Sequence, residues 1–348
     1  MKLQAATWMR RAAKLAELLP KSRLHPAVLD WTARRRARDP WFVALSGGVD
    51  SISLLLLVWL HWPEHREQLR VVHYNHRLRG RASDADERFC RELCRVLGVK
   101  LLVGHRGDRQ RISNEAQARE LRFAVIDRVM LRARSHTLWL GHQQNDVAET
   151  ILMRLSRGSG TSGLAAPRPV QSMPNRRIHL RPLLNLQRSD IEQAMTAVRL
   201  PWREDTSNTG DDYFRNRIRR DVVPNWVEAA GRDALAGAAL SRELLEEDDV
   251  ALAQWTDRIC AAMPSARLDL KALTDVPRAV VRRVLHTWLL KQTGMGVLSR
   301  QAFAQLLDSV ITGENTRQSM GMHLFAVIRR QELYMEPNPA VSTKHRRR

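Results

Sequence analysis

The chain has few cysteines, and their scarcity excludes two kinds of site. Only Cys90, Cys94 and Cys260 occur among its 348 residues, and the first two are four residues apart rather than in a C-x-x-C arrangement. Three thiols cannot build a disulfide framework or a zinc site with four cysteine ligands. So little cysteine is typical of a protein that works in a reducing cytosol.

Long apolar runs are also missing. The longest ends at His61 and is far shorter than the roughly 20 residues that a membrane helix requires. The first 39 residues hold ten basic and three acidic side chains, but their single serine argues against a transit peptide. We therefore expect a cytoplasmic protein without a membrane partner. The apolar spacing of this segment predicts an N-terminal helix with Trp8, Ala12, Leu15, Leu18 and Leu19 on its apolar face.

Acidic residues are outnumbered by basic ones. The 37 Asp and Glu face 57 Lys and Arg, which gives a net charge of +20. Residues 223–348 hold 17 basic and 14 acidic side chains, so nearly all of the excess, +17, lies in residues 1–222. A field of this strength attracts polyanions, and nucleic acid is the first candidate.

What the chain does contain is a short glycine turn between two apolar runs. Ser46-Gly47-Gly48-Val49-Asp50-Ser51 follows Trp41 to Leu45 and precedes Ile52 to Leu60. This pattern predicts a buried strand, a tight turn and the first turn of a helix, whose unpaired N–H groups attract an anion. The segment lacks the Lys of a Walker loop and the third glycine of a dinucleotide loop. It therefore predicts a different phosphate-binding loop, in which the two serines add hydroxyl donors.

Short apolar runs alternate with helical segments in the first half of the chain. The runs are 42–45, 69–74, 99–103 and 137–141, and the predicted helices are 50–60, 84–97 and 114–134. This alternation predicts an α/β fold with a Rossmann-like parallel sheet, in which ligands bind beyond the carboxyl ends of the strands. Polar residues follow three of the runs at that edge: Ser46, His73 to His76, and His142.

The second half of the chain is predicted to be mostly helical. Residues 156–177 are rich in Gly, Ser and Pro and predict a long loop beside the site. Pro224 marks a boundary, after which we expect helices over 225–263, 277–291 and 299–311 and a small β-hairpin over 318–336. These features divide the chain into a basic helical extension (1–39), two domains (40–223 and 224–336) and a basic tail (337–348) that is expected to be disordered.

A pair of carboxylates lies shortly after His142. We interpret His142 itself as a contact to substrate or nucleotide. Asp146 and Glu149 are three residues apart and would share one face of a helix. Two adjacent carboxylates raise each other's pKa unless a cation lies between them, and a metal ion or a substrate ammonium would fill that place. The alternative is simple capping of the helix by Asn145 and Asp146.

Histidines and an asparagine gather at the end of the second run. His73, Asn75 and His76 lie in the segment VHYNHRLR, at the edge of the sheet where ligands are expected. A lone histidine at a strand end is usually structural. Together these side chains are interpreted as contacts to substrate or nucleotide.

Two groups of arginines are the other candidates. Arg119 and Arg122 share one helix face, which is either solvated or binds phosphate. Arg215 and Arg217 belong to the dense run FRNRIRR. Guanidinium groups contact phosphates or carboxylates well through their forked donors.

Seven segments in order, between Trp41 and Trp226, resemble the tRNA(Ile)-lysidine synthetase family of the PP-loop ATP pyrophosphatases. The segments are SGGVDS, VHYNHRLR, SNEAQARELR, GHQQNDVAETILMRLSRGSGTSGL, RPLL, PWREDTSN and RNRIRRDVVP. No single segment establishes the likeness, but their order leaves little room for coincidence. Residues 230–335 add only weak support, because this part of the family is more variable.

The resemblance implies an enzyme that uses ATP to adenylate the C2 carbonyl oxygen of the wobble cytidine in a tRNA(Ile) with a CAU anticodon. Free L-lysine then displaces AMP and produces lysidine. Residues 40–223 would be the ATP-binding catalytic domain and residues 224–336 the tRNA-binding domain. The implied cofactors are ATP and Mg²⁺, and the implied partners are the tRNA and L-lysine. Whether the chain forms a homodimer is left open.

The resemblance also implies roles for named residues. The loop residues Ser46, Gly47, Gly48, Val49 and Ser51 would hold the leaving pyrophosphate. Asp50 would place Mg²⁺ or orient the activated base. Asp146 and Glu149 would bind the lysine ammonium and accept protons from it, and Arg215 or Arg217 would stabilise phosphate charge during adenylation.

One departure from the family concerns Asn145, Asp146 and Val147, where the family usually has two aspartates and a glutamine. Asp146 remains, so we expect activity, but a role that needs both aspartates is lost. Two other functions stay open. A tRNA thiolase of the same superfamily would need paired or catalytic cysteines, and a noncatalytic RNA-binding protein would release neither AMP nor pyrophosphate.

Overall fold

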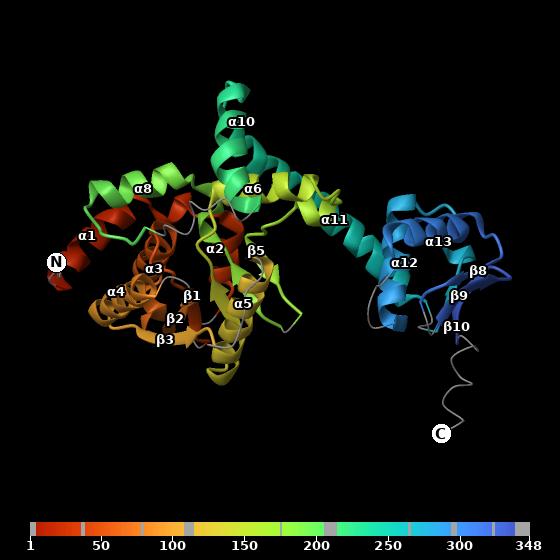
Figure 1. The fold of residues 1–348 in the computed structure, drawn as a ribbon, viewed down its shortest axis with the longest axis horizontal. Coiled ribbons are helices and arrows are strands. Elements are labelled where there is room, and N and C mark those ends of the chain that lie inside the picture. The colour runs from red at the N-terminus through yellow and green to blue at the C-terminus, as the bar shows by residue number, and fades with distance from the viewer. Residues whose placement is uncertain are drawn as a thin grey trace. The chain divides into compact units, whose positions relative to one another are not determined.

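The computed structural model describes residues 5–35, 39–77, 80–107, 115–174, 176–204, 214–263, 266–293, 298–321 and 324–337 (Figure 1). The chain forms two compact units, Met1–Glu246 and Glu247–Arg348. Parts of the predicted motifs lie outside the described residues, namely 78–79, 113–114, 205–208 and the basic tail. No helix among the described residues is long and apolar enough to cross a membrane.

A six-stranded sheet forms the centre of the first unit. Its order is β3-β2-β1-β4-β6-β5, and all neighbours are parallel except β5 and β6. The strands are β1 (Trp41–Ala44), β2 (Leu69–Asn75), β3 (Lys100–His105), β4 (Thr137–Trp139), β5 (Val170–Ser172) and β6 (Ile178–Leu180). The four predicted runs are β1 to β4, so the α/β fold with a parallel sheet is confirmed.

The strand β5 corrects one prediction. It lies within residues 156–177, predicted as a long loop, together with the short helix α7 (Thr161–Leu164). β5 is an edge strand of three residues that pairs antiparallel with β6, with Gln171 beside His179. A strand this short has no apolar alternation to mark it in the sequence, because pairing with β6 is what orders it.

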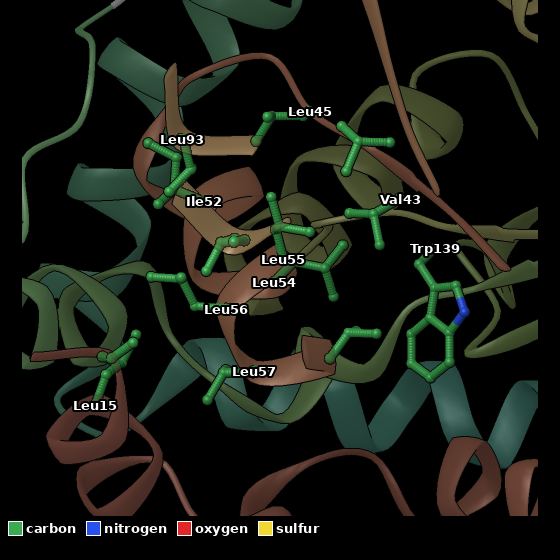
Figure 2. Close-up of a cluster of buried hydrophobic side chains, with 14 of the residues drawn as sticks. Leu15, Val43, Leu45, Ile52, Leu54, Leu55, Leu56, Leu57, Leu93 and Trp139 are labelled. Carbon is green, nitrogen blue, oxygen red and sulfur yellow. The ribbon is translucent and has the colours of Figure 1, made fainter. Parts of the chain in front are cut away.

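Helices cover both faces of the sheet. The helical elements around it are α1 (Ala5–Leu18), η1 (Lys21–Arg23), α2 (Pro26–Ala33), α3 (Val49–His61), η2 (Pro63–Gln68), α4 (Arg81–Leu97), α5 (Glu115–Arg132), α6 (Gln144–Leu155), η3 (Pro182–Asn185) and α8 (Arg188–Ala197). Trp41 and Val43 of β1 pack with α3 and α4 in one core, whereas Phe42 packs with α5 in another. Figure 2 shows the first core, to which α3 contributes Leu54 to Leu57. The strands are apolar on both sides because both sides are covered.

The N-terminal helix is part of the core of this unit. Trp8, Ala12, Leu15 and Leu19 are buried and pack with α3, as the apolar spacing predicted. Leu18 was assigned to the same face, but 47% of its surface is exposed, so that assignment is wrong. A second helix, α2, follows within the same segment, which was predicted as a helical extension over residues 1–39.

The end of the first unit is not the single helix predicted over 225–263. The chain forms α9 (Phe214–Arg217), a π-helical turn η5 (Ile218–Val222), α10 (Val223–Ala230) and α11 (Ala234–Ala261). Gly231 adopts a left-handed conformation with φ +61° and ends α10. Ile218, Val223 and Leu235 pack together against Ala148 of α6. These contacts keep the first turns of α11 with the first unit, so the division between units falls within α11 rather than at Pro224.

The second unit combines helices with a four-stranded antiparallel sheet in the order β7-β10-β9-β8. Its elements are β7 (Arg267–Asp269), η6 (Lys271–Leu273), α12 (Arg278–Thr293), α13 (Arg300–Thr312), β8 (Thr316–Ser319), β9 (Leu324–Arg329) and β10 (Glu332–Pro337). The predicted hairpin is β9 and β10, whose turn residues Arg330 and Gln331 have φ +51° and +64°. β7 and β8 were missed because each is short and mostly polar. The prediction of a hairpin alone is therefore incomplete.

Candidate active site

The predicted phosphate loop connects β1 to α3, and its serines hold its backbone. The N–H groups of Ser46 and Gly47 both donate to Ser51 Oγ at 3.2 Å, and Gly48 N–H donates to Ser46 Oγ at 3.3 Å. Ser51 Oγ donates in turn to the Gly48 carbonyl oxygen at 2.9 Å. The hydroxyls predicted as donors to phosphate thus also shape the loop, and α3 begins directly after it at Val49.

Two glycines let other segments approach this loop closely. Gly47 has φ +97°, a conformation that side-chain-bearing residues rarely adopt, and its carbonyl oxygen accepts from Arg203 N–H at 2.8 Å. A Cβ on Gly141, just after β4, would lie 3.0 Å from the Asp50 carbonyl oxygen. The carboxyl end of β4 therefore packs directly on the start of α3. Arg203 also pairs with the buried Asp86 at 2.8 Å, a contact that no sequence pattern indicated.

Asp50 lies at the start of α3 in a poorly hydrated environment. Burial raises its pKa from 3.8 to about 7, with a smaller contribution from the negative charge of Asp146. Asp50 Oδ1 is buried and has no hydrogen-bond partner among the described residues. A carboxylate oxygen so placed, next to a phosphate loop, suits Mg²⁺, which is usually held by one or two carboxylates and by substrate phosphates. The described residues contain no cluster of three or more acidic, His or Cys side chains that could hold a metal alone.

The carboxylates of Asp146 and Glu149 lie side by side on the first turns of α6. Asp146 Oδ2 accepts from Gln143 N–H at 2.9 Å and completes a capping box with the Gln143 side chain. Asp146 therefore caps the helix, as the alternative interpretation held, but its other oxygen points into an ion-pair cluster. Burial raises the pKa of Asp146. Glu149 is buried, with 1% of its surface exposed.

The cation between these carboxylates belongs to the chain itself. Arg215 donates from Nε to Glu149 Oε2 at 2.7 Å and from Nη2 to Asp146 Oδ1. Arg219 binds Glu149 through two donors, at 2.6 and 3.1 Å, and lies 3.6 Å from Asp146. The position predicted for a metal ion or a substrate ammonium is thus taken by guanidinium groups. Arg219 was not among the predicted site residues, although its spacing of four from Arg215 was a signal.

A group of arginines surrounds His142, which follows β4. Arg181 donates from Nε to His142 Nδ1 at 3.0 Å and is itself buried. Burial first, and then the charges of Arg181, Arg119, Arg215 and Arg122, lower the pKa of His142 well below its usual value, so its ring is neutral. The predicted pair Arg119 and Arg122 therefore lies within electrostatic reach of this histidine. Arg181 was missed, although it begins the segment RPLL.

The residues at the end of β2 make structural contacts. His73 shares a hydrogen bond of 2.8 Å between Nδ1 and the Leu45 carbonyl oxygen, and burial lowers its pKa. Asn75 donates to Glu87 at 3.0 Å and accepts from Arg77 N–H at 2.9 Å. The His76 ring lies edge-on to Tyr74, with centroids 4.6 Å apart. His73 and Asn75 tie β2 to the end of β1 and to α4, so their contacts support the site's framework.

Arg215 and Arg217 differ in their placement. Arg215 reaches the carboxylates, whereas Arg217 is exposed and its guanidinium lies 5.9 Å from the Phe214 ring centroid. Asn145, which departs from the family pattern, accepts from Arg188 N–H at 3.0 Å and so binds the start of α8. Val147 is buried in the protein interior. Neither departure adds a charge to the carboxylate pair.

A family model described as PP-loop domain matches residues 20–226, which is more than half of the chain. The chain belongs to the PP-loop family. The match covers the loop, the carboxylate pair and the arginine cluster, and it implies ATP as the nucleotide of this site. A second model, described as TilS substrate binding domain, matches residues 268–334 in the second unit of this PP-loop protein.

Two relatives share the name tRNA(Ile)-lysidine synthase. The protein from Geobacter sulfurreducens is 34% identical over 296 residues, which are 80% of this chain and 61% of that protein. The one from Symbiobacterium thermophilum is 35% identical over 271 residues, 74% of this chain and 56% of that protein. The PP-loop chain thus spans roughly three fifths of the length of these relatives.

One solved structure confirms the fold. The U34-tRNA thiolase NcsA from Methanococcus maripaludis superimposes with a TM-score of 0.50 at 18% identity, over 69% of this chain and 79% of that one. At this identity the likeness concerns the arrangement of strands and helices and carries no chemistry.

Proposed function

We propose that this PP-loop protein is a tRNA(Ile)-lysidine synthase, which joins L-lysine to C2 of the wobble cytidine of a CAU-anticodon tRNA(Ile) in the cytoplasm. One observation carries the proposal. A phosphate loop, a buried carboxylate pair and an arginine cluster meet at the carboxyl edge of the parallel strands of a single sheet. The names of the relatives and the match of the second unit to a substrate-binding domain support the same function.

The loop serves the first half of the reaction, in which the cytidine O2 attacks the α-phosphate of ATP and pyrophosphate leaves. The N–H groups at the start of α3 are preorganised donors for the departing charge. The hydroxyls of Ser46 and Ser51, which hydrogen-bond within the loop, would turn toward the phosphates. Arg181 donates to His142, whose neighbour Gly141 packs against the start of α3, and the charges of Arg119, Arg122 and Arg215 also act on this histidine. Asp50 would hold Mg²⁺, which when bound neutralises phosphate charge.

The carboxylate pair serves the second half, in which the ε-amine of lysine attacks C2 and AMP leaves. Free lysine is mostly protonated at neutral pH, whereas the attacking amine must be neutral. Asp146 can bind the ammonium and accept its proton, because burial raises the pKa of this carboxyl. Asn145 is not needed for this step, since its side chain is engaged by α8.

The tRNA is the polyanion that fits the charge of the chain. Residues 1–222 carry a net charge of +17, and contacts of their Lys and Arg side chains to phosphates would supply salt-dependent affinity. Contacts to unpaired anticodon bases would supply specificity. The homodimer stays a prediction.

The arrangement of the thiols argues against sulfur transfer. Cys90 and Cys94 are buried in the core of the first unit, and Cys260 lies in the second unit. Burial raises the pKa of Cys94 to about 12 and also raises that of Cys90, so both are poor nucleophiles.

Mass analysis of the wobble nucleoside tests the proposal directly. The full chain is incubated with ATP, Mg²⁺, labelled L-lysine and CAU-anticodon tRNA(Ile), and we expect labelled lysidine with one AMP and one pyrophosphate released per lysine. A variant with all three cysteines changed to Ala should be equally active. An unmodified cytidine with correctly folded protein would favour a noncatalytic RNA-binding protein, and loss of activity in the cysteine variant would favour a thiolase.

A further inference from the structure

The carboxylates that would bind lysine are filled by the chain's own guanidinium groups. Glu149 accepts hydrogen bonds from both Arg215 and Arg219, and Asp146 accepts one from Arg215. We propose that Arg215 is a specificity-determining residue that occupies the place of the lysine ammonium until an anion at the phosphate site draws it away. This inference rests on the proposed function, because it takes lysine as the ligand of Asp146 and Glu149.

The charges at the site define what can replace Arg215. Two carboxylates and two guanidinium groups are neutral together. If Arg215 leaves, one negative charge remains, which one ammonium group neutralises. Arg219 then still binds Glu149 through two donors, whereas Asp146 has lost its close cationic partner. The vacated place therefore lies at Asp146 and has the charge and donor requirement of a single primary ammonium.

Arg215 and Arg219 also differ in how they are held. Arg219 lies in η5, next to Ile218, which packs in an apolar cluster with Val223 and Leu235. Arg215 lies in α9, which continues directly into η5, and its neighbour Phe214 packs against the same cluster, so the two arginines differ in their donors rather than in their backbone. Arg215 gives one donor to each carboxylate, so a single side-chain movement removes the close cationic partner of Asp146, while Arg219 keeps both of its hydrogen bonds to Glu149. Arg219 is the fixed partner and Arg215 the exchangeable one.

The destination of Arg215 is the arginine cluster around His142. Arg215 already acts on the pKa of His142 together with Arg119, Arg122 and Arg181. Like charges so close repel, so without an anion the carboxylates are the better partners for Arg215. A bound phosphate chain reverses this preference, because a guanidinium binds phosphate through two charge-assisted hydrogen bonds. Anion binding and lysine binding are thereby coupled through one side chain, and lysine binds tightly only after the nucleotide.

Equilibrium binding of labelled L-lysine to the full chain, with and without inorganic pyrophosphate, tests this coupling. For the unmodified protein we expect pyrophosphate to tighten lysine binding about tenfold or more, as the release of one charge-assisted hydrogen bond predicts. In Arg215→Ala, lysine should bind tightly without pyrophosphate, and pyrophosphate should add less than about twofold. Arg215→Lys keeps the charge but cannot bridge both carboxylates, so it should fall between the two.

Arg220→Ala is the matched control, since Arg220 lies on the same segment, is exposed and pairs with Asp221. It removes the same charge and should bind lysine like the unmodified protein. If Arg215→Ala does not fold, Arg215→Gln is measured in its place. Persistence of the full pyrophosphate effect without Arg215, or its absence in the unmodified protein, overturns the inference. If lysidine forms but lysine binding is the same with and without Arg215, the proposed function stands and only the exchange of Arg215 for lysine fails. If lysine does not bind and no lysidine forms, the proposed function itself fails.

Discussion

At the residue scale, burial decides the chemistry of the acidic groups. Burial raises the pKa of Asp50 to about 7. It also raises the pKa of Asp146, although the charges of Arg215 and Arg219 act in the opposite direction. A carboxyl in such surroundings is destabilising when ionised and favours any cation that approaches. Under the proposed function, Asp50 is the carboxyl for a divalent ion, and Asp146, which is paired with Arg215 in this structure, is the carboxyl for an ammonium group.

Asp50→Asn should change how stability depends on pH. The pKa of Asp50 in the folded chain, about 7, lies above the ordinary 3.8, so between these values the folded state holds more protons than the unfolded state. The free energy of unfolding of the unmodified chain should fall over this range as the pH rises. Asn cannot ionise, so the variant should gain relative stability that is absent below pH ~4 and reaches at most about 4 kcal/mol above pH ~7. Urea denaturation in EDTA at several pH values gives the free energy of unfolding of both proteins. If the difference between them does not change with pH, the raised pKa of Asp50 is contradicted.

Gly141→Ala should disturb the loop from the side of β4. The new Cβ would lie 3.0 Å from the Asp50 carbonyl oxygen and 3.3 Å from Ser51 N, both backbone atoms that cannot move without the helix start. We expect a loss of about 1–3 kcal/mol of stability and at least about tenfold weaker ATP binding, in line with the loss of one charge-assisted hydrogen bond. Calorimetric titration with an ATP analogue measures the second effect. Gly237→Ala is the control, because no atom lies within 4 Å of its added Cβ, and it should leave ATP binding unchanged.

At the element scale, each part of the site depends on a neighbour distant in sequence. α6 presents the carboxylates, but α9 and η5 neutralise them from about 70 residues further along the chain. The loop after β1 is supported by β4 and by Arg203. The N-terminal helix α1 completes the core under α3.

Leu15→Ala should show that α1 belongs to this core. Leu15 is fully buried, so truncation should cost about 2–5 kcal/mol of the free energy of unfolding. Leu18→Ala, on the same helix, removes a side chain that is 47% exposed and should stay within about 0.5 kcal/mol. Denaturation in urea compares the two variants. Equal losses would mean that α1 packs by a different face.

At the scale of the whole molecule, net charge is the property that bears on the proposed tRNA substrate. The first 222 residues carry +17, whereas the rest are close to neutral. Phosphate contacts release counterions, so their affinity falls steeply with salt. The charge distribution thus favours the first unit as the source of backbone contacts.

Binding of tRNA should therefore depend strongly on ionic strength. With about six phosphate contacts, affinity should fall roughly a thousandfold between 50 and 200 mM salt. Filter binding of CAU-anticodon tRNA(Ile) over this range gives the slope. A slope near zero would contradict an electrostatic role for the basic half.

The strong local patterns were sufficient to predict the frame of the site. Four apolar runs became β1 to β4, and the glycine turn leads into α3 as expected. Short polar strands such as β5 and β8 could not be predicted, because they are ordered by their partners rather than by their own residues. The single predicted helix over 225–263 failed because Gly231 takes a left-handed conformation between two helical stretches. The sequence also could not tell Arg215 from Arg217, since only a packed helix decides which side chain faces inward.

The sequence by itself determined that this chain has a phosphate-binding glycine turn, a parallel sheet around it and carboxylates at the edge where ligands bind. Those features follow from periodicity and local backbone preference, which depend on neighbouring residues. Only the tertiary structure decided that Arg215 and Arg219 neutralise the carboxylates and that Arg181 lies against His142. Ion pairs of this kind form between segments far apart in the chain, because folding removes them from water and leaves each buried charge to find its partner in space.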